Sequence, residues 1–222
     1  MGRRLILLRH GQTEYNATRR MQGQLDTELS AIGVEQARAA GLLMRELGVT
    51  KIVASDLLRA TRTAEIVAAV LGLEFTQDAR LRETHLGDWQ GKTHAEVDET
   101  DTGARAHWRN NAGWAPPEGE SRLDVARRAR PVVDELMATY DDWDGGAVLL
   151  VAHGGTISAL TSNLLGFGEA QYPLFKGLGN TNMSRLQAMP KYREGATGTG
   201  FASTAPEDVQ WYLEAWNQGL SL

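Results

Sequence analysis

The chain has 222 residues, of which 42% are hydrophobic and 23% charged, a composition typical of a single globular α/β domain. Its formal net charge of −5 argues against nonspecific nucleic-acid binding, which depends mainly on neutralising phosphates. The lack of cysteine excludes disulfides, cysteine-ligated zinc and cysteine nucleophiles. The apolar run before Arg9 is too short for a signal peptide and no run is long enough to span a membrane, so we expect a soluble cytoplasmic protein.

The first pattern that indicates chemistry is Leu-Ile-Leu-Leu-Arg-His-Gly-Gln-Thr at residues 5–13. An apolar run closed by a turn residue is typical of a short strand buried on both faces, and open α/β sheets bind ligands at the carboxyl ends of such strands. Arg9 and His10 stand at that end, where a guanidinium can hold a phosphoryl group and an imidazole can attack it. A second apolar run, residues 148–152, ends at His153, so two histidines can meet at one sheet edge.

The residues after the first motif predict a loop and then alternating helices and strands. Ser30 is a suitable N-cap for a helix that ends at Gly48, and Ser55 or Asp56 for a helix that ends at Gly72. Apolar residues recur at helical spacing in both, which predicts one buried face each. The expected elements are a loop over 14–28, a helix over 31–47, a strand over 51–54, a helix over 57–71 and an edge strand over 73–75.

Residues 86–120 form a long segment with little periodicity that contains Trp89, Trp108 and Trp114. Unstructured loops of this length are uncommon inside compact domains unless they are lids, binding loops or disordered, and three tryptophans argue against disorder. We therefore expect a partly helical lid inserted at about 86–120. Its indoles can pack the interior of the lid or stack against a sugar ring.

The remaining residues repeat the alternation of helices and strands. Ser121 begins a capping box for a helix in which Pro131 predicts a kink or a restart. The second histidine strand follows, and the segment 191–206, rich in Gly and Thr, is expected to be mobile. The other expected elements are a helix over 156–165 and strands over 183–189 and 209–216.

Phosphoryl transfer needs charge stabilisation, a nucleophile in line with the leaving group, and a proton for the leaving oxygen. Arg9, Arg59 and His153 are candidates for the charge stabilisation, because Arg59 lies in the first turn of its helix, where an anion is favoured. His10 is the candidate nucleophile, and two nearby arginines would keep it neutral. Glu83 is the candidate general acid, although it could instead pair with Arg82 at the surface. No metal and no cofactor are required, and the histidines at 85, 94 and 107 are too far apart in sequence for a typical zinc site.

Four blocks of sequence together resemble the histidine phosphatase superfamily, in its phosphoglycerate-mutase-like branch. They occur in the order of the family, at residues 8–16, 55–64, 81–83 and 151–155. The resemblance implies a three-layer α/β/α sandwich with a mostly parallel central sheet, and one histidine phosphatase domain over residues 1–222. It also implies that His10 is phosphorylated, that Glu83 donates the proton, and that the phosphate pocket consists of Arg9, Arg59 and His153, lined further by Asn16 and Gln22.

A closer resemblance is to those members of the family that hydrolyse a phosphorylated sugar-glycerate and form homodimers. It rests on residues 20–30 and 80–91 and on Trp114-Ala115-Pro116. The implied partner is a small phosphorylated metabolite, without nucleic acid or membrane. A phosphoglycerate-type mutase, which returns the phosphoryl group to its substrate, is an alternative. So are a broad-specificity acid phosphatase and a binding module that has lost catalysis.

Overall fold

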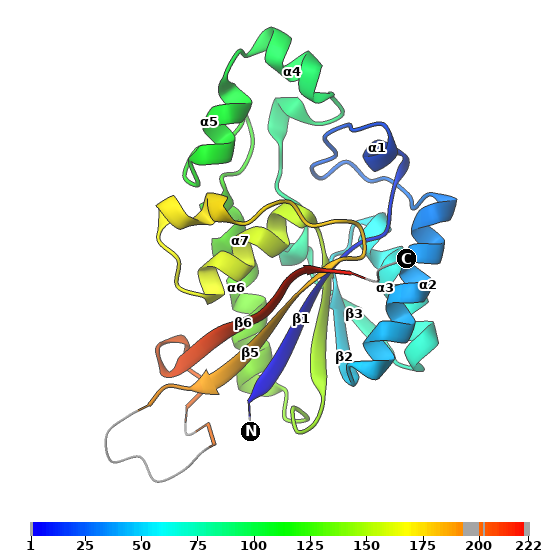
Figure 1. Ribbon diagram of the computed structural model, residues 1–222, viewed down its shortest axis with the longest axis vertical. Coiled ribbons are helices and arrows are strands. Elements are labelled where there is room, and N and C mark those ends of the chain that lie inside the picture. The colour runs from blue at the N-terminus through cyan, green and yellow to red at the C-terminus, as the bar shows by residue number, and fades with distance from the viewer. Residues whose placement is uncertain (1, 193–199, 202, 220–222) are drawn as a thin grey trace.

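The fold is built on a six-stranded sheet (Figure 1). The computed structural model describes residues 2–192, 200–201 and 203–219. The strand order is β3-β2-β4-β1-β5-β6; β1 to β4 run parallel, β5 is antiparallel to β1, and β6 is antiparallel to β5. The strands are β1 (Arg3–Arg9), β2 (Val49–Ala54), β3 (Phe75–Gln77), β4 (Ala147–Ala152), β5 (Met183–Pro190) and β6 (Val209–Gln218).

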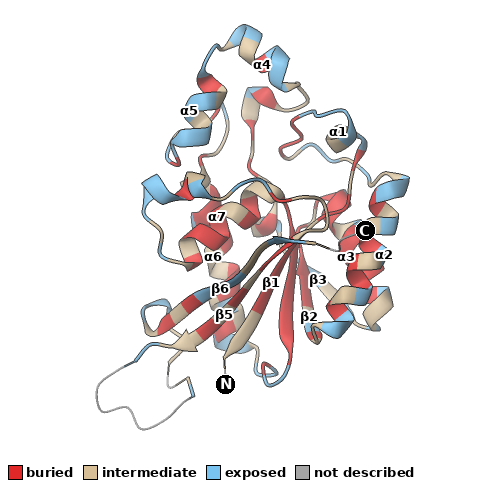
Figure 2. Ribbon diagram, viewed as in Figure 1, coloured by how far each residue is buried: buried red, intermediate tan, exposed pale blue. Residues whose placement is uncertain are grey.

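Helices cover both faces of the sheet, and the inner strands β1, β2 and β4 are its most buried part (Figure 2). Alternate residues of a strand point to opposite faces. Leu5 and Leu7 of β1 therefore share a core with α6 and α7, whereas Ile6 and Leu8 share one with α2 and α3. The expected α/β class with a mostly parallel sheet is confirmed. The helices are α1 (Glu14–Ala17), α2 (Ala31–Glu46), α3 (Leu58–Leu71), α4 (His94–Thr100), α5 (Ala104–Asn110), α6 (Arg122–Thr139) and α7 (Gly154–Leu164).

The carboxyl ends of three parallel strands lie side by side. Arg9 pairs with Ala152 in the ladder between β1 and β4, so His10 and His153 leave the sheet at the same level. The amide of His10 continues the ladder by donating to the Ala152 carbonyl at 3.0 Å. Ser55 follows β2, the strand on the other side of β4. The sheet thereby brings polar residues that are far apart in sequence to one edge.

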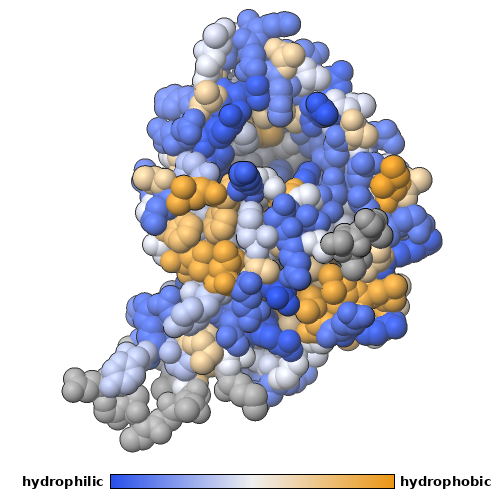
Figure 3. All heavy atoms as spheres, viewed as in Figure 1, coloured by the Kyte–Doolittle hydropathy of each residue, from blue (hydrophilic) through white to orange (hydrophobic). Residues whose placement is uncertain are grey.

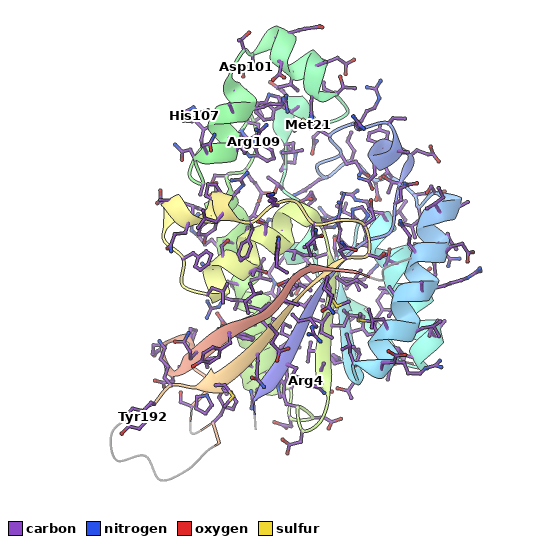
Figure 4. All side chains as sticks on the ribbon, viewed as in Figure 1. Arg4, Met21, Asp101, His107, Arg109 and Tyr192 are labelled. Atoms are coloured by element: carbon purple, nitrogen blue, oxygen red, sulfur yellow. The ribbon has the colours of Figure 1, made fainter. Side chains whose placement is uncertain are left out.

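Residues 86–120, called the lid below, lie above this edge of the sheet (Figure 1). The lid contains α4 and α5 and has a small core of its own. Trp89 is 2% exposed and packs against the rings of Trp108 and Trp114, with centroids 5.9 and 5.6 Å away. Met21 joins this core from the loop after β1, and Figure 4 shows it between α4 and α1. All three indoles therefore pack the lid, and Trp108 also lines the cavity described below.

The expected start of the second helix is wrong. The N-cap of α3 is Leu57, which has no side-chain acceptor, and the Ser55 hydroxyl accepts from the Leu57 amide at 3.3 Å. Asp26 supplies the cap from outside the helix, because its carboxylate accepts from the Leu58 amide at 2.7 Å. Asp56 is instead paired with a guanidinium, that of Arg82.

Other expected boundaries also shift. Of the two alternatives predicted at Pro131, the restart is wrong, because α6 is one helix from Arg122 to Thr139, and the kink stays a prediction. Packing of the buried face of α6 offsets the backbone hydrogen bond that proline cannot make. The expected loop over 14–28 contains α1, β3 begins at Phe75 rather than Leu73, and α7 begins at Gly154 rather than Thr156. The two C-terminal strands are confirmed.

Residues 193–199 and 202 of the segment 191–206, which the composition predicts to be mobile, lie outside the described residues. Among the helices that the structure describes, none is long and apolar enough to cross a membrane.

Candidate active site

A cavity of about 470 Å³ lies between the carboxyl edge of the sheet and the lid. Figure 3 shows the surface hollowed at this place, with hydrophilic side chains around the hollow. The structure brings six of the seven predicted site residues to its wall, namely Arg9, His10, Asn16, Gln22, Arg59 and Glu83. The seventh, His153, is fully buried and lies beside His10 without lining the cavity.

His10 is held in the form that a nucleophile requires. Its Nδ1 lies 2.7 Å from the carbonyl oxygen of Gly11, and since a carbonyl can only accept, Nδ1 carries the proton and Nε2 the lone pair. Burial, and then the charges of Arg59 and Arg9, lower the pKa of His10 well below its ordinary value of 6.5. His10 is therefore neutral, as expected, although burial is a larger cause than the arginines.

The turn after His10 depends on close backbone contact. A Cβ at Gly11 would lie 2.4 Å from the carbonyl oxygen of Gly33 in α2, so no larger residue fits. The Gly11 amide donates to the Thr63 hydroxyl of α3 at 3.1 Å. Two helices on one face of the sheet thus fix the backbone that orients the nucleophile.

His153 packs against the ring of His10 and is itself fully buried. Its ring centroid is 5.1 Å from that of His10, and its Nε2 lies 2.9 Å from the hydroxyl of Ser55. Burial, Arg59 and His10 lower the pKa of His153 well below 6.5. Its Nδ1 is buried and has no partner in the described part of the chain. The predicted contact of His153 with phosphate stays a prediction.

Arg9 and Arg59 place two cations beside the nucleophile. Arg59 is fully buried, and its Nη1 and Nη2 donate to the carbonyls of Leu25 and Gly23 at 2.8 and 2.7 Å. Burial lowers the pKa of Arg59 to about 10 and also lowers that of Arg9, so both remain charged at neutral pH. Arg9 is anchored by a bond from Nη1 to the Leu178 carbonyl. The Nε atoms of both arginines have no acceptor among the described residues.

Asn16 and Gln22 present donors to the cavity because their acceptors are already used. The Gln22 Oε1 accepts from the hydroxyls of Thr13 and Thr27 at 2.9 and 2.6 Å. The Asn16 Oδ1 accepts from the Thr13 amide and from Asn180 Nδ2, both at 3.1 Å. The amide nitrogens of Asn16 and Gln22 are thereby left to donate, which suits a phosphate.

The sequence analysis missed Thr13 and Asn180 as residues that orient the site. Thr13 could have been found, because Thr-x-x-Asn is a helix-capping pattern and Thr13 caps α1. Asn180 lies in a turn-rich segment far along the chain, where no local pattern marks it.

Glu83 is held at the start of α7. Its carboxylate accepts from the amides of Thr84, Gly155 and Thr156 at 2.8, 3.1 and 3.1 Å. The alternative of a surface pair with Arg82 is wrong, because Arg82 is paired with Asp56. Glu83 instead lines the cavity together with His10.

Arg128 of α6 holds the backbone of Glu83 in place through hydrogen bonds. The sequence did not indicate this role. The Arg128 Nη2 donates to the Glu83 carbonyl at 2.9 Å, and its Nη1 to the Arg80 carbonyl at 2.7 Å. The same guanidinium forms two bonds with the carboxylate of Glu120, at 2.8 and 2.9 Å. Arg128 looks like any surface helical arginine in sequence, so no local signal identifies it.

The cavity is strongly cationic. Five fixed cations line it in the described residues, against the single carboxylate of Glu83: Arg9, Arg20, Arg59, Arg122 and Lys176. Such a wall attracts an anion and concentrates it near the nucleophile. Groups of three or more metal-ligating side chains are absent from the described ranges. A neutral imidazole, the guanidiniums of Arg9 and Arg59 and a carboxyl together form a site suited to transfer of a phosphoryl group.

The chain belongs to the histidine phosphatase superfamily (branch 1), whose sequence profile it matches over residues 5–196. Among the relatives, it is 48% identical over 220 residues to the glucosyl-3-phosphoglycerate phosphatase of Mycobacterium tuberculosis (strain ATCC 25618 / H37Rv), covering 97% of this chain and 94% of that protein. It is 38% identical over 163 residues to a probable phosphoglycerate mutase of Salmonella arizonae (strain ATCC BAA-731 / CDC346-86 / RSK2980), covering 73% and 74%.

A solved structure of mycobacterial glucosyl-3-phosphoglycerate phosphatase in complex with VO3 has the same fold. It superimposes with a TM-score of 0.87 at 46% identity, over 97% of this chain and 99% of that one. The likeness therefore extends over the sheet and the lid, and beyond the sequence blocks that indicated the family.

Proposed function

We propose that this protein hydrolyses a phosphomonoester through a phosphohistidine intermediate, without a metal, and that its substrate is glucosyl-3-phosphoglycerate. The observation that carries the proposal is the neutral His10, with its Nε2 lone pair free, in one cavity with the buried Arg59, Arg9 and the Glu83 carboxyl. The substrate rests on the similarity to the mycobacterial phosphatases.

In the first step, His10 Nε2 attacks phosphorus and the P–O bond to the alcohol breaks. The electron pair of that bond goes to the leaving oxygen, which takes a proton from Glu83. Arg9 and Arg59 bind the non-bridging oxygens, where charge develops; one well-placed donor of this kind is worth on the order of 10²- to 10³-fold in rate.

In the second step, water attacks the phosphohistidine and gives a proton to Glu83. The N–P bond breaks and its electron pair returns to Nε2, so that inorganic phosphate leaves and the site is restored. A general acid and base placed in this way contributes roughly 10²- to 10⁴-fold.

The test is release of free phosphate from glucosyl-3-phosphoglycerate and from a panel of other phosphorylated metabolites. The His10→Ala variant should lose about 10³-fold or more in turnover, and radiolabelled substrate should leave an acid-labile label on the wild-type protein alone. His107→Ala is the matched control, because His107 is exposed on α5 and does not line the cavity (Figure 4). Turnover by His10→Ala at the wild-type rate would refute the mechanism.

A mutase is distinguished by its product. Conversion of 3-phosphoglycerate to 2-phosphoglycerate with little free phosphate would indicate a mutase, in line with the similarity to the probable phosphoglycerate mutase of Salmonella arizonae. Equal rates across the whole panel would instead favour a broad-specificity acid phosphatase. The homodimer and the cytoplasmic location stay predictions, to be checked by sedimentation of the purified protein and by cell fractionation.

A further inference from the structure

Arg122 is a cation that neither the fold nor the proposed chemistry explains. It is the first residue of α6, is partly buried, and lines the cavity on the side of the lid. Its Cζ lies 5.2 Å from the ring centroid of Trp108, and its Nη1 donates to the Arg109 carbonyl at 2.8 Å. The guanidinium is thus held in place by the lid, with its other N–H groups free to bind a ligand.

The other arginines of α6 have acidic partners. Arg127 pairs with Asp124, Arg128 with Glu120, and Arg130 with Asp134. Arg122, by contrast, has no carboxylate within ion-pair distance in the ranges that the structure describes.

Local electrostatics disfavour a cation at this position. Burial, and then the charge of Arg109, lower the pKa of Arg122, and the amino end of a helix repels positive charge. An anion bound in the cavity would offset the unfavourable burial and repulsion of the Arg122 charge. The proposed mechanism assigns the same effect to Arg59, which binds the phosphate.

Two other residues that line the cavity also lack acceptors. The indole Nε1 of Trp108, which lines the same cavity, is buried and has no partner among the residues described. Lys176 lines the cavity without an acidic partner in that part of the chain, whereas Arg20 is paired with Glu96. Beyond Arg9 and Arg59, donors in the wall of the cavity therefore exceed acceptors.

We propose that Arg122, supported by Trp108 and Lys176, forms a second anion subsite that binds the carboxylate of the substrate while Arg9 and Arg59 hold its phosphate. This rests on the proposed phosphatase function and names the residue that recognises the glycerate carboxylate of the proposed substrate. The planar fork of one guanidinium matches a carboxylate with two parallel hydrogen bonds. The subsite makes Arg122 a determinant of specificity and leaves the phosphoryl chemistry to His10 and Glu83.

The test compares 3-phosphoglycerate with glycerol 3-phosphate. Both release a primary alkoxide, and they differ in carrying a carboxylate or a hydroxymethyl group. Arg122→Gln should lower kcat/KM about 10- to 100-fold for 3-phosphoglycerate and less than about threefold for glycerol 3-phosphate, because a lost charge-assisted hydrogen bond affects only the ligand that makes it. Arg122→Lys should recover part of the loss, since it keeps the charge without the fork.

Arg109→Gln is the matched control, because it removes a neighbouring arginine that is exposed and does not line the cavity. Its ratio of kcat/KM for the two substrates should equal that of the wild type. If Arg122→Gln loses both activities equally, or neither, the subsite is wrong.

Lys176→Gln keeps the test decisive if Arg122→Gln does not fold. Lys176 is exposed, so its loss should leave the fold intact and lower kcat/KM about 3- to 10-fold for 3-phosphoglycerate alone. An unchanged ratio in this variant would also overturn the subsite. The proposed function fails separately, if the wild-type protein releases phosphate neither from glucosyl-3-phosphoglycerate nor from these two substrates.

Discussion

Replacing Arg128 with methionine should separate the positioning of Glu83 from the rest of the chemistry. Arg128 does not line the cavity, yet it donates to the carbonyls of Glu83 and Arg80 and forms two bonds with the Glu120 carboxylate. Methionine keeps much of the side-chain volume and removes all four bonds. The perturbation therefore acts on the segment that carries the general acid.

The magnitude follows from what each partner retains. The Glu83 carbonyl still accepts from Gln24 Nε2 at 3.0 Å, and Glu120 still accepts from the His85 amide at 2.8 Å. The Arg80 carbonyl loses its bond to Arg128. The ion pair of Arg128 with Glu120 is only partly shielded from water, because the two side chains are 21% and 25% exposed. We therefore expect the free energy of unfolding to fall by about 2–4 kcal/mol, somewhat less than the roughly 3–5 kcal/mol lost when a fully buried pair is broken.

The effect on catalysis should depend on the leaving group. A displaced Glu83 protonates the leaving oxygen poorly, and a misplacement of about 1 Å can reduce the rate about 10²-fold. An alkyl phosphate needs that proton, whereas p-nitrophenolate leaves without it. We expect kcat to fall roughly 10- to 100-fold for glycerol 3-phosphate and only a few-fold for p-nitrophenyl phosphate.

Arg127→Met is the matched control, because Arg127 directly precedes Arg128 in the same helix and its side chain is 74% exposed. It should change stability by less than about 0.5 kcal/mol and leave both activities unchanged. Chemical denaturation and steady-state kinetics on the two variants check these values. Equal losses on the two substrates in Arg128→Met would refute the argument that this arginine acts through the general acid.

Three further predictions concern the buried parts of the site and the lid. Ser55→Ala removes the one partner of His153 Nε2 that the structure gives and should lower kcat about tenfold and stability by about 1–2 kcal/mol, measured by kinetics and denaturation. Trp89→Ala should destabilise the lid by about 3 kcal/mol or more and speed amide hydrogen exchange in α4 and α5, whereas Trp89→Phe should do so far less. Because the folded pKa values of His10 and His153 lie below the unfolded value of 6.5, their neutral forms favour folding above pH 6.5, and this stability should be lost progressively as the pH falls below it. The decline in Tm between pH 7 and 5 should be smaller in His153→Asn than in the wild type. An equal decline in the two proteins would contradict the view that protonation of the buried His153 destabilises the fold.

Local patterns were enough to predict most elements of the fold. The apolar runs at 5–8 and 148–152 predicted the two central strands, because a strand covered on both faces needs no polar alternation. Gly48 and Gly72 marked helix ends and have φ values of 71° and 68°, which glycine adopts at no cost. Where the prediction of a helix boundary failed, residues distant in sequence determine the boundary. Asp26 caps α3, and packing against the sheet keeps α6 continuous at Pro131.

The site was predictable only where a motif marked it. Arg9, His10 and Glu83 lie in recognisable blocks, and the parallel ladder brings the two histidine strands together. Arg122 and Arg128 both look like solvated helical arginines in sequence. Their roles depend on Trp108 and Glu120, which only the packing of the lid and of α6 brings into contact with them.

Burial of His10 matters more for its reactivity than the arginines do. The charges of Arg9 and Arg59 oppose protonation of His10 in the free site, but a bound phosphate dianion cancels them and attracts a proton to the imidazole. Burial is the largest cause of the lowered pKa, and the substrate does not remove it. In the proposed mechanism, the packing around the Gly11 turn shields His10 from water and so keeps the proposed nucleophile neutral when phosphate binds.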